Sequence, residues 1–104
     1  MQNSGLDVDL DRVFDRKIVT ALVGMRVEIN RVENIAAEIV SEPHVEDVFV
    51  VTGDFDIIVK VRFPDYNEFQ KYILNRLSKI SGVRDSKTMM VVSIKKENKR
   101  VFVE

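Results

Sequence analysis

The fold is decided by residues 45–63, VEDVFVVTGDFDIIVKVRF. Residues 45–51 are rich in β-branched side chains, and apolar residues then recur at every second position from Phe55 to Phe63, which is the period of a strand. Thr52-Gly53-Asp54 between the two runs has turn chemistry, because glycine takes positive φ without a Cβ clash. The stretch therefore predicts a β-hairpin.

Two helices and two further strands are predicted around this hairpin. Apolar residues alternate over 18–29, as in a long strand, and Asn30 with Glu33 forms a capping-box pair ahead of a helix over 31–41. Asp65 and Glu68 form a second capping pair ahead of a helix over 65–80. A last long strand is predicted over 83–94, and 101–103 could add an edge strand.

The resulting order, β-α-β-β-α-β, is the ferredoxin-like arrangement of an α+β domain, with an antiparallel sheet and both helices on one face. We expect one such domain over residues 18–104, preceded by an N-terminal extension over 1–17. The face without helices is expected to be apolar and to bind a second copy of the chain. The residues predicted on that face are Leu22, Val48, Val50, Ile58, Met89 and Val91.

Composition excludes several classes of protein. The 104 residues suffice for one core, and no apolar run approaches the roughly 18 residues of a membrane span. Sixteen basic and seventeen acidic residues give a net charge of -1, so direct binding of nucleic acid is not expected. The chain has no cysteine, and residues 1–11 do not resemble a secretory signal, so we expect a cytoplasmic protein.

The residues needed for catalysis are scarce. His44 is the only histidine and is expected in an exposed loop, so neither a metal site nor a cofactor site is predicted, and we do not expect an enzyme. Asp54 and Asp56 flank Phe55 and would share one face of a strand, where two carboxylates could bind a cation or an ammonium group. They could also be simply a turn aspartate and an acid at the start of a strand, because Gly-Asp turns are frequent.

Two segments together resemble a known family. Residues 50–61, VVTGDFDIIVKV, followed after the second predicted helix by residues 80–88, ISGVRDSKT, resemble the effector domain of the Lrp/AsnC, or feast/famine, transcription regulators. The family pattern has a Thr-Gly-x-Phe/Tyr-Asp hairpin and then Gly-Val-x-x-Thr-x-Thr entering the last strand. Ser86 stands where the first of those threonines is usual. The similarity covers roughly residues 18–96.

The resemblance implies a domain that forms dimers sheet to sheet, assembles into rings of dimers and binds amino acids between dimers. An effector's ammonium group needs an acceptor and its carboxylate needs backbone N–H or hydroxyl donors. Asp54 or Asp56 could supply the acceptor, and Gly53, Ser86 and Thr88 could supply the donors. The effector residues carried over from the family are Thr52, Gly53, Asp54, Phe55, Asp56, Ser86 and Thr88.

One departure from the family lies at the front of the chain. Family members carry a helix-turn-helix domain before the effector domain, and about seventeen residues are too few for three helices. The sequence leaves open whether this is a stand-alone effector domain or a fragment. We expect an accessory regulator of transcription that could co-assemble with full-length relatives. The alternative is an ACT-like regulatory domain, whose ligand would control a metabolic enzyme.

Overall fold

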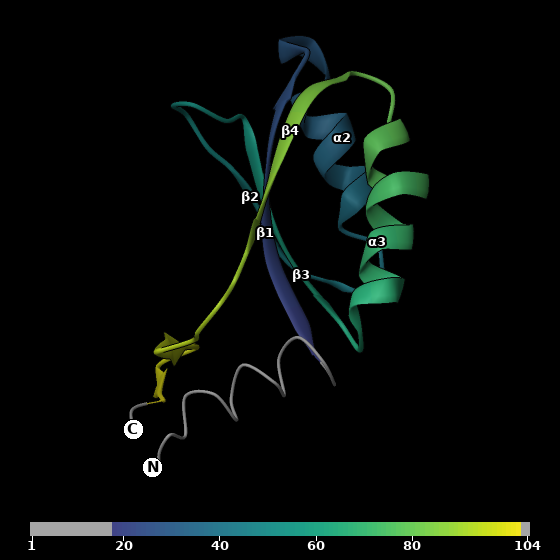
Figure 1. Ribbon diagram of the computed structural model, residues 1–104. Helices are drawn as coiled ribbons and strands as arrows, with labels where there is room; N and C mark the ends of the chain where they lie inside the picture. The colour runs from purple at the N-terminus through teal and green to yellow at the C-terminus, as the bar shows by residue number, and fades with distance from the viewer. Residues whose placement is uncertain (1–17, 103–104) are drawn as a thin grey trace.

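A single four-stranded sheet forms the centre of the computed structural model, which describes residues 18–102 (Figure 1). The predicted N-terminal extension, 1–17, lies outside the described residues. The strands run in the order β2-β3-β1-β4, and every neighbouring pair is antiparallel. Their bounds are β1 Val19–Val27, β2 Val45–Val50, β3 Ile57–Phe63 and β4 Val83–Met90.

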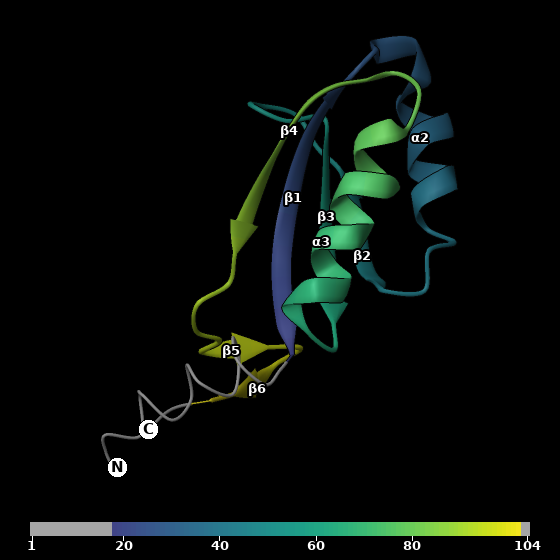
Figure 2. The same cartoon turned by 45° about the vertical axis from the view of Figure 1, so that its right-hand side comes forward.

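Two helices, α2 Val32–Ile39 and α3 Tyr66–Asn75, cover one face of this sheet, as Figure 2 shows from a second direction. The predicted ferredoxin-like α+β fold is therefore confirmed. The core lies between the helices and the sheet, because alternate residues of β1 and β3 point toward the helices. Its fully buried side chains include Val19, Val23, Met25, Ile35, Ile39, Ile57, Val59 and Val61.

The start of the first helix differs from the prediction. Asn30 lies inside a 3-10 turn, η2 Ile29–Arg31, and the N-cap of α2 is Arg31, which makes no side-chain capping hydrogen bond. The predicted Asn30–Glu33 capping box is therefore wrong, since an N-cap residue needs an extended backbone that Asn30 does not have. The helix also ends at Ile39, which leaves Val40 60% exposed.

The second helix begins as predicted. Asp65 is its N-cap, and Asp65 Oδ1 accepts a hydrogen bond from the backbone N–H of Glu68 at 2.8 Å. The α-helix ends at Asn75 and continues as a separate 3-10 turn, η3 Leu77–Lys79, so the predicted single helix over 65–80 is divided in two. Leu77 stays buried in the core despite this break.

The C-terminal part of the chain leaves the sheet earlier than expected. The last strand of the main sheet, β4, ends at Met90. β5 Lys96–Glu97 and β6 Arg100–Val101 pair with each other as a separate ribbon. Of the edge strand expected over 101–103, Val101 lies in β6, which pairs with β5 and not with the main sheet, and residue 103 lies outside the described part. Asn98 and Lys99 between the two strands both have positive φ, as in a tight two-residue hairpin turn.

The register of the sheet corrects part of the predicted helix-free face. Val48 pairs with Val59 and Val50 with Ile57, and both partners are buried beneath the helices, so Val48 and Val50 belong to the helix-covered face. The register of β2 shifts between Val45 and Asp47, so residues on the two sides of this shift do not follow one simple alternation of faces. Phe49, between them, pairs with Ile58 and takes the place on the helix-free face that was assigned to its neighbours.

The other residues predicted on that face fall as follows. Leu22 pairs with Met89 and Gly24 with Ile58, and all four alternate with core residues of their strands. These pairs therefore lie on the face without helices, as expected for Leu22, Ile58 and Met89. Val91 follows the end of β4, and its N–H donates to Thr20 O at 2.9 Å.

Candidate functional site

The tip of the β2–β3 hairpin is anchored to the central strand. Gly53 has φ of +127°, a conformation that favours glycine, and Val51 N–H donates to Asp56 O at 2.9 Å to close the loop. Arg26, on β1, donates from its Nη1 to the backbone oxygen of Asp54 at 2.7 Å. The position of the hairpin is therefore fixed by contacts with β1 as well as by its own turn.

Asp56 makes the second anchor. Its Oδ2 accepts a hydrogen bond from Val27 N–H at 2.9 Å, and its own N–H donates to Met25 O at 2.8 Å. The Val27 N–H needs a side-chain partner because the β1–β4 pairing shifts register between Arg26 and Val27. Asp56 is half-buried, whereas Asp54 is exposed at the tip. The two predicted acids therefore differ, and only Asp54 presents its carboxylate fully to solvent.

Phe55, between these acids, folds back over the central strand. A Cβ atom built on Gly24 would lie 2.7 Å from Cδ2 of the Phe55 ring, which is closer than side chains tolerate. The ring therefore occupies the space that a side chain at position 24 would need. Gly24 lies on the helix-free face, so Phe55 extends that face toward the hairpin.

The remaining two predicted effector residues lie across β1 from the hairpin. Ser86 pairs with Met25 and Thr88 with Val23, so both hydroxyls belong to the helix side of the edge strand β4, where they are exposed. Met25 also pairs with Ile57, so the backbones of Ser86 and Ile57 are separated by two strand spacings, about 10 Å. One protomer brings the five hairpin residues together and leaves Ser86 and Thr88 on another surface.

An apolar surface occupies the hairpin end of the helix-free face. Phe49 is 55% exposed and Met89 is 45% exposed, while the other members are half-buried. We call this surface the apolar face, and it consists of Leu22, Phe49, Phe55, Ile58 and Met89. Sequence alternation predicted three of its five members.

A charged cluster lies beside the apolar face on the same side of the sheet, since Lys60 pairs with Leu22. Lys60 Nζ lies 2.7 Å from Glu97 Oε2 and 3.1 Å from Asp47 Oδ2, and Arg62 pairs with both Glu97 and Glu46. The hydrogen bond from Lys60 is the main cause that lowers the pKa of Glu97, and the same bond raises the pKa of Lys60. Glu97 thereby holds the β5–β6 ribbon against the sheet.

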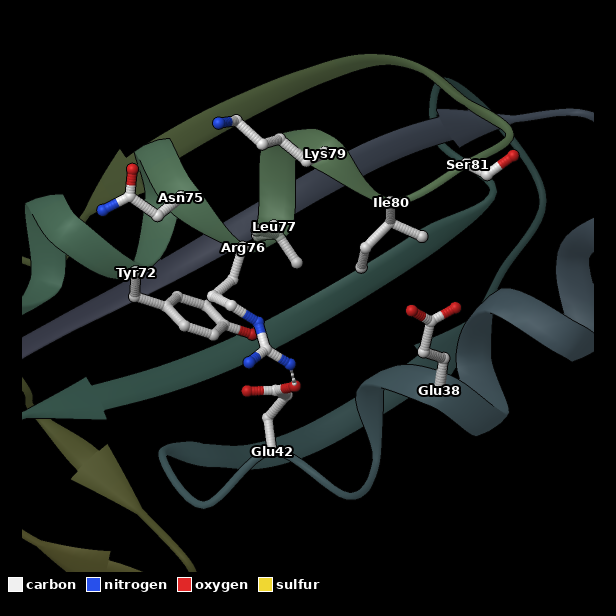
Figure 3. Close-up of a pocket in the computed structure, with 9 residues that line it drawn as sticks. All are labelled: Glu38, Glu42, Tyr72, Asn75, Arg76, Leu77, Lys79, Ile80 and Ser81. Carbon is white, nitrogen blue, oxygen red and sulfur yellow. Dashed lines mark hydrogen bonds and ion pairs between the residues drawn. The ribbon is translucent and has the colours of Figure 1, made fainter.

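A pocket of about 390 Å³ lies between the helices, on the other side of the molecule (Figure 3). Tyr72 forms part of its wall, and its hydroxyl is buried without a hydrogen-bond partner in the described residues. Burial is the main cause that raises the pKa of Tyr72 to about 12, and the nearby Glu42 carboxylate adds to it. The lining residues are Glu38, Glu42, Tyr72, Asn75, Arg76, Leu77, Lys79, Ile80 and Ser81.

No residue of this pocket was predicted as functional from the sequence. Neither Tyr72 nor Glu42 belongs to a capping pair or motif that the sequence predicts. The two residues meet through the packing of α3 beside α2, and Arg76 forms an ion pair with Glu42 across this contact. Spacing along the chain gives no signal for such a pair.

Comparison with known proteins identifies the family of the domain. Residues 20–101 match the family model of the Lrp/AsnC ligand binding domain. The chain belongs to the Lrp/AsnC family. The resemblance noted in the sequence is therefore confirmed.

The relatives of this Lrp/AsnC domain are transcription regulators. A helix-turn-helix transcriptional regulator of Pyrococcus abyssi is 31% identical over 78 residues, which cover 75% of this chain and 49% of the relative. The chain spans about half the length of the curated relatives it matches. In the described residues, no helix is long and apolar enough to cross a membrane.

Solved structures share the fold. AsnC of E. coli superposes with a TM-score of 0.71 at 18% identity, over 96% of this chain and 64% of AsnC. A transcriptional regulator from Neisseria meningitidis, solved as a complex with L-Met, superposes with a TM-score of 0.67 at 25% identity. That match covers 97% of this chain and 60% of the regulator.

Proposed function

We propose that this Lrp/AsnC domain is a non-enzymatic transcription-regulatory module that dimerises through the apolar face and binds an amino-acid effector between protomers. The observation that supports this proposal best is the exposure of Phe49 and Met89 beside Leu22 and Ile58, on a sheet face that no helix covers. A second copy presenting the same face would bury all of them. Such a self-complementary surface suits a two-fold dimer.

The charged cluster is compatible with a dimer that forms through the apolar face. Lys60 and Arg62 are already neutralised by Glu97, Glu46 and Asp47 within the protomer, so a second copy need not supply their partners. An unpaired charge buried at an interface would oppose association. Pairing within the protomer leaves the apolar end to supply the free energy of association, since removal of apolar area from water is favourable.

The effector part of the proposal concerns the exposed hairpin tip and the edge strand. Asp54 at the tip can accept an ammonium group, and the hydroxyls of Ser86 and Thr88 can donate to a carboxylate. In one protomer these groups lie on different surfaces, so a site that uses all of them has to form between protomers. Thr52, Gly53 and Phe55 would shape its wall, with Asp56 holding the hairpin. The L-Met complex of the Neisseria regulator supports an amino acid as the ligand class.

Binding of DNA would come from helix-turn-helix domains in the assembly, such as the curated relatives carry. The chain has a net charge of -1, which offers little general attraction for a polyanion. We propose that the domain also enters mixed assemblies with full-length Lrp/AsnC proteins and alters their response to the effector. Higher rings of dimers would arise through contacts at the hairpin.

Sedimentation at micromolar concentration tests the dimer. We expect wild-type protein to sediment as a dimer or a multiple of dimers, and Phe49→Glu and Met89→Glu to shift it to monomer, because each introduces a charge into the interface. Leu74→Glu is the matched control, since Leu74 is 64% exposed on the outer surface of α3. A monomeric wild type, or equal effects of all three substitutions, contradicts the proposed interface.

Thermal unfolding with each of the twenty amino acids tests the effector site. A ligand that binds only the native state raises the melting temperature. At least one amino acid should do so, and Asp54→Asn should reduce the shift for that amino acid without changing the melting temperature of the free protein. Absence of any shift, or a full shift in Asp54→Asn, contradicts the effector site.

A further inference from the structure

We propose that the pocket between α2 and α3 is a second ligand site, separate from the hairpin, for a small zwitterion with a compact apolar group such as an aliphatic α-amino acid. The pocket lies within one protomer, on the helix side of the sheet (Figure 3), whereas the apolar face is on the opposite side. Its volume of about 390 Å³ lies near the lower end of the range for small-molecule pockets. Binding there would not depend on dimerisation or on the effector site at the hairpin.

The Tyr72 hydroxyl is the group that most clearly indicates a ligand in the pocket. The residue is only 8% exposed, because its ring packs on Phe63 with centroids 5.1 Å apart, yet its hydroxyl has no hydrogen-bond partner in the described residues. Buried hydroxyls are normally paired, since leaving one unpaired is unfavourable. In Figure 3 the hydroxyl lies beside the Arg76 guanidinium at the wall of the pocket. A bound carboxylate could accept from both groups.

Arg76 can serve such a ligand without giving up its own partner. Its Nη2 pairs with Glu42, which leaves other N–H donors of the guanidinium available for a second acceptor. The ion pair also fixes the position of the guanidinium at the contact between the two helices. Arg76 and Tyr72 together therefore form a donor pair suited to one carboxylate.

The other end of the pocket offers the opposite charge. Glu38, on α2, points toward Ile80 and makes no ion pair within residues 18–102 (Figure 3). Its carboxylate can accept an ammonium group, while Ile80 and Leu77 provide an apolar surface between the two charged ends. Two acids and two bases line the pocket, so a ligand with one charge of each sign keeps the local balance. A ligand that is only an anion or only a cation would upset this charge balance.

The tyrosine content allows a direct test. The chain has two tyrosines and no tryptophan, so in Tyr66→Phe the intrinsic fluorescence comes from Tyr72 alone. The purified Tyr66→Phe protein is titrated with glycine, alanine, valine, leucine, isoleucine and methionine in turn. We expect at least one to change the emission saturably. Glu38→Gln in this background should weaken that ligand about tenfold, through loss of a charge-assisted hydrogen bond. Glu33→Gln, an exposed acid on the same helix but outside the pocket, should leave it unchanged.

Two further variants separate this site from the hairpin site. Asp54→Asn should leave the Tyr72 signal intact, whatever happens to the thermal shift that tests the hairpin. Tyr72→Phe should leave the free protein as stable as wild type, or more stable, and should weaken the same ligand about tenfold in calorimetric titration. The proposal is overturned if none of the six amino acids alters Tyr72 emission. It is also overturned if Asp54→Asn abolishes the change or Glu38→Gln leaves it intact.

Discussion

The carboxylate of Asp56 accepts the backbone N–H of Val27 at 2.9 Å, so a residue expected to bind an effector also joins the hairpin to the central strand. Asp54, two residues earlier, contributes its backbone oxygen to Arg26 and keeps its side chain exposed. The two acids in the Asp-Phe-Asp sequence therefore have different roles in the folded protomer. A substitution at one cannot be interpreted like a substitution at the other.

Asp56→Ala should destabilise the protein. It removes the acceptor of the Val27 N–H, and a partly buried donor left without a partner costs about 1–3 kcal/mol. Asp56→Asn should cost less, because the amide oxygen can still accept. Urea unfolding measures both, with Asp54→Ala as the control at the exposed tip. Equal free energies of unfolding for the Asp56→Ala and Asp54→Ala proteins would show that the Val27 bond does not stabilise the fold.

Gly24→Ala should displace the Phe55 ring. The added methyl group would lie 2.7 Å from the ring, and overpacking of this kind costs typically about 1–3 kcal/mol. The cost should fall in the double variant Gly24→Ala/Phe55→Ala, because the clash disappears with the ring. A double-mutant cycle on the free energy of unfolding measures this coupling. Additive effects at the two positions would contradict the contact.

Glu97→Gln should release the β5–β6 ribbon from the sheet and change the response to acid. Hydrogen bonding by Lys60 lowers the pKa of Glu97 in the folded state, so its contribution to stability is present above its ordinary pKa of 4.5. That contribution is lost as the pH falls through the lower folded pKa. The variant should be roughly 1 kcal/mol less stable at neutral pH, with a smaller loss on acidification.

The measurement for Glu97 is the free energy of unfolding in urea at several pH values. Glu68→Gln is the comparison, since Glu68 forms an exposed pair with Lys71 on α3. That pair should contribute little, because water screens it and both side chains lose mobility to form it. An acid response of Glu97→Gln identical to wild type would mean that Glu97 is not the group that titrates.

Local signals predicted the order of elements, because strand alternation and helix stripes act over short distances. The Asp65 cap is such a signal and is confirmed, since the capping side chain and its target N–H are three residues apart. The same pattern at Asn30 failed because a 3-10 turn placed that residue inside the helical segment. Val48 and Val50 were assigned to the wrong face because the register shift near Val45 depends on the pairing with β3, which the sequence of one strand does not contain.

The hairpin site and the pocket around Tyr72 also differ in how far the sequence could predict them. The hairpin residues are contiguous, so a family pattern could identify them, although their grouping with Ser86 and Thr88 stays a prediction that needs a second protomer. The pocket around Tyr72 combines residues more than thirty positions apart, Glu42 with Arg76, and depends on the packing of two helices. Motif spacing therefore carries no information about it.

Raising the pH should destabilise the fold through Tyr72. Burial raises its pKa to about 12, whereas in the unfolded chain a tyrosine ionises near about 10. Between these values the unfolded state has released the proton and the folded state has kept it, so the free energy of unfolding falls as the pH rises through about 10 to 12. In Tyr66→Phe, absorbance of the single tyrosinate should titrate near pH 12, and Tyr72→Phe should flatten the alkaline loss of stability. A tyrosinate midpoint near 10 in the folded Tyr66→Phe protein would instead mean that the Tyr72 hydroxyl is in contact with water.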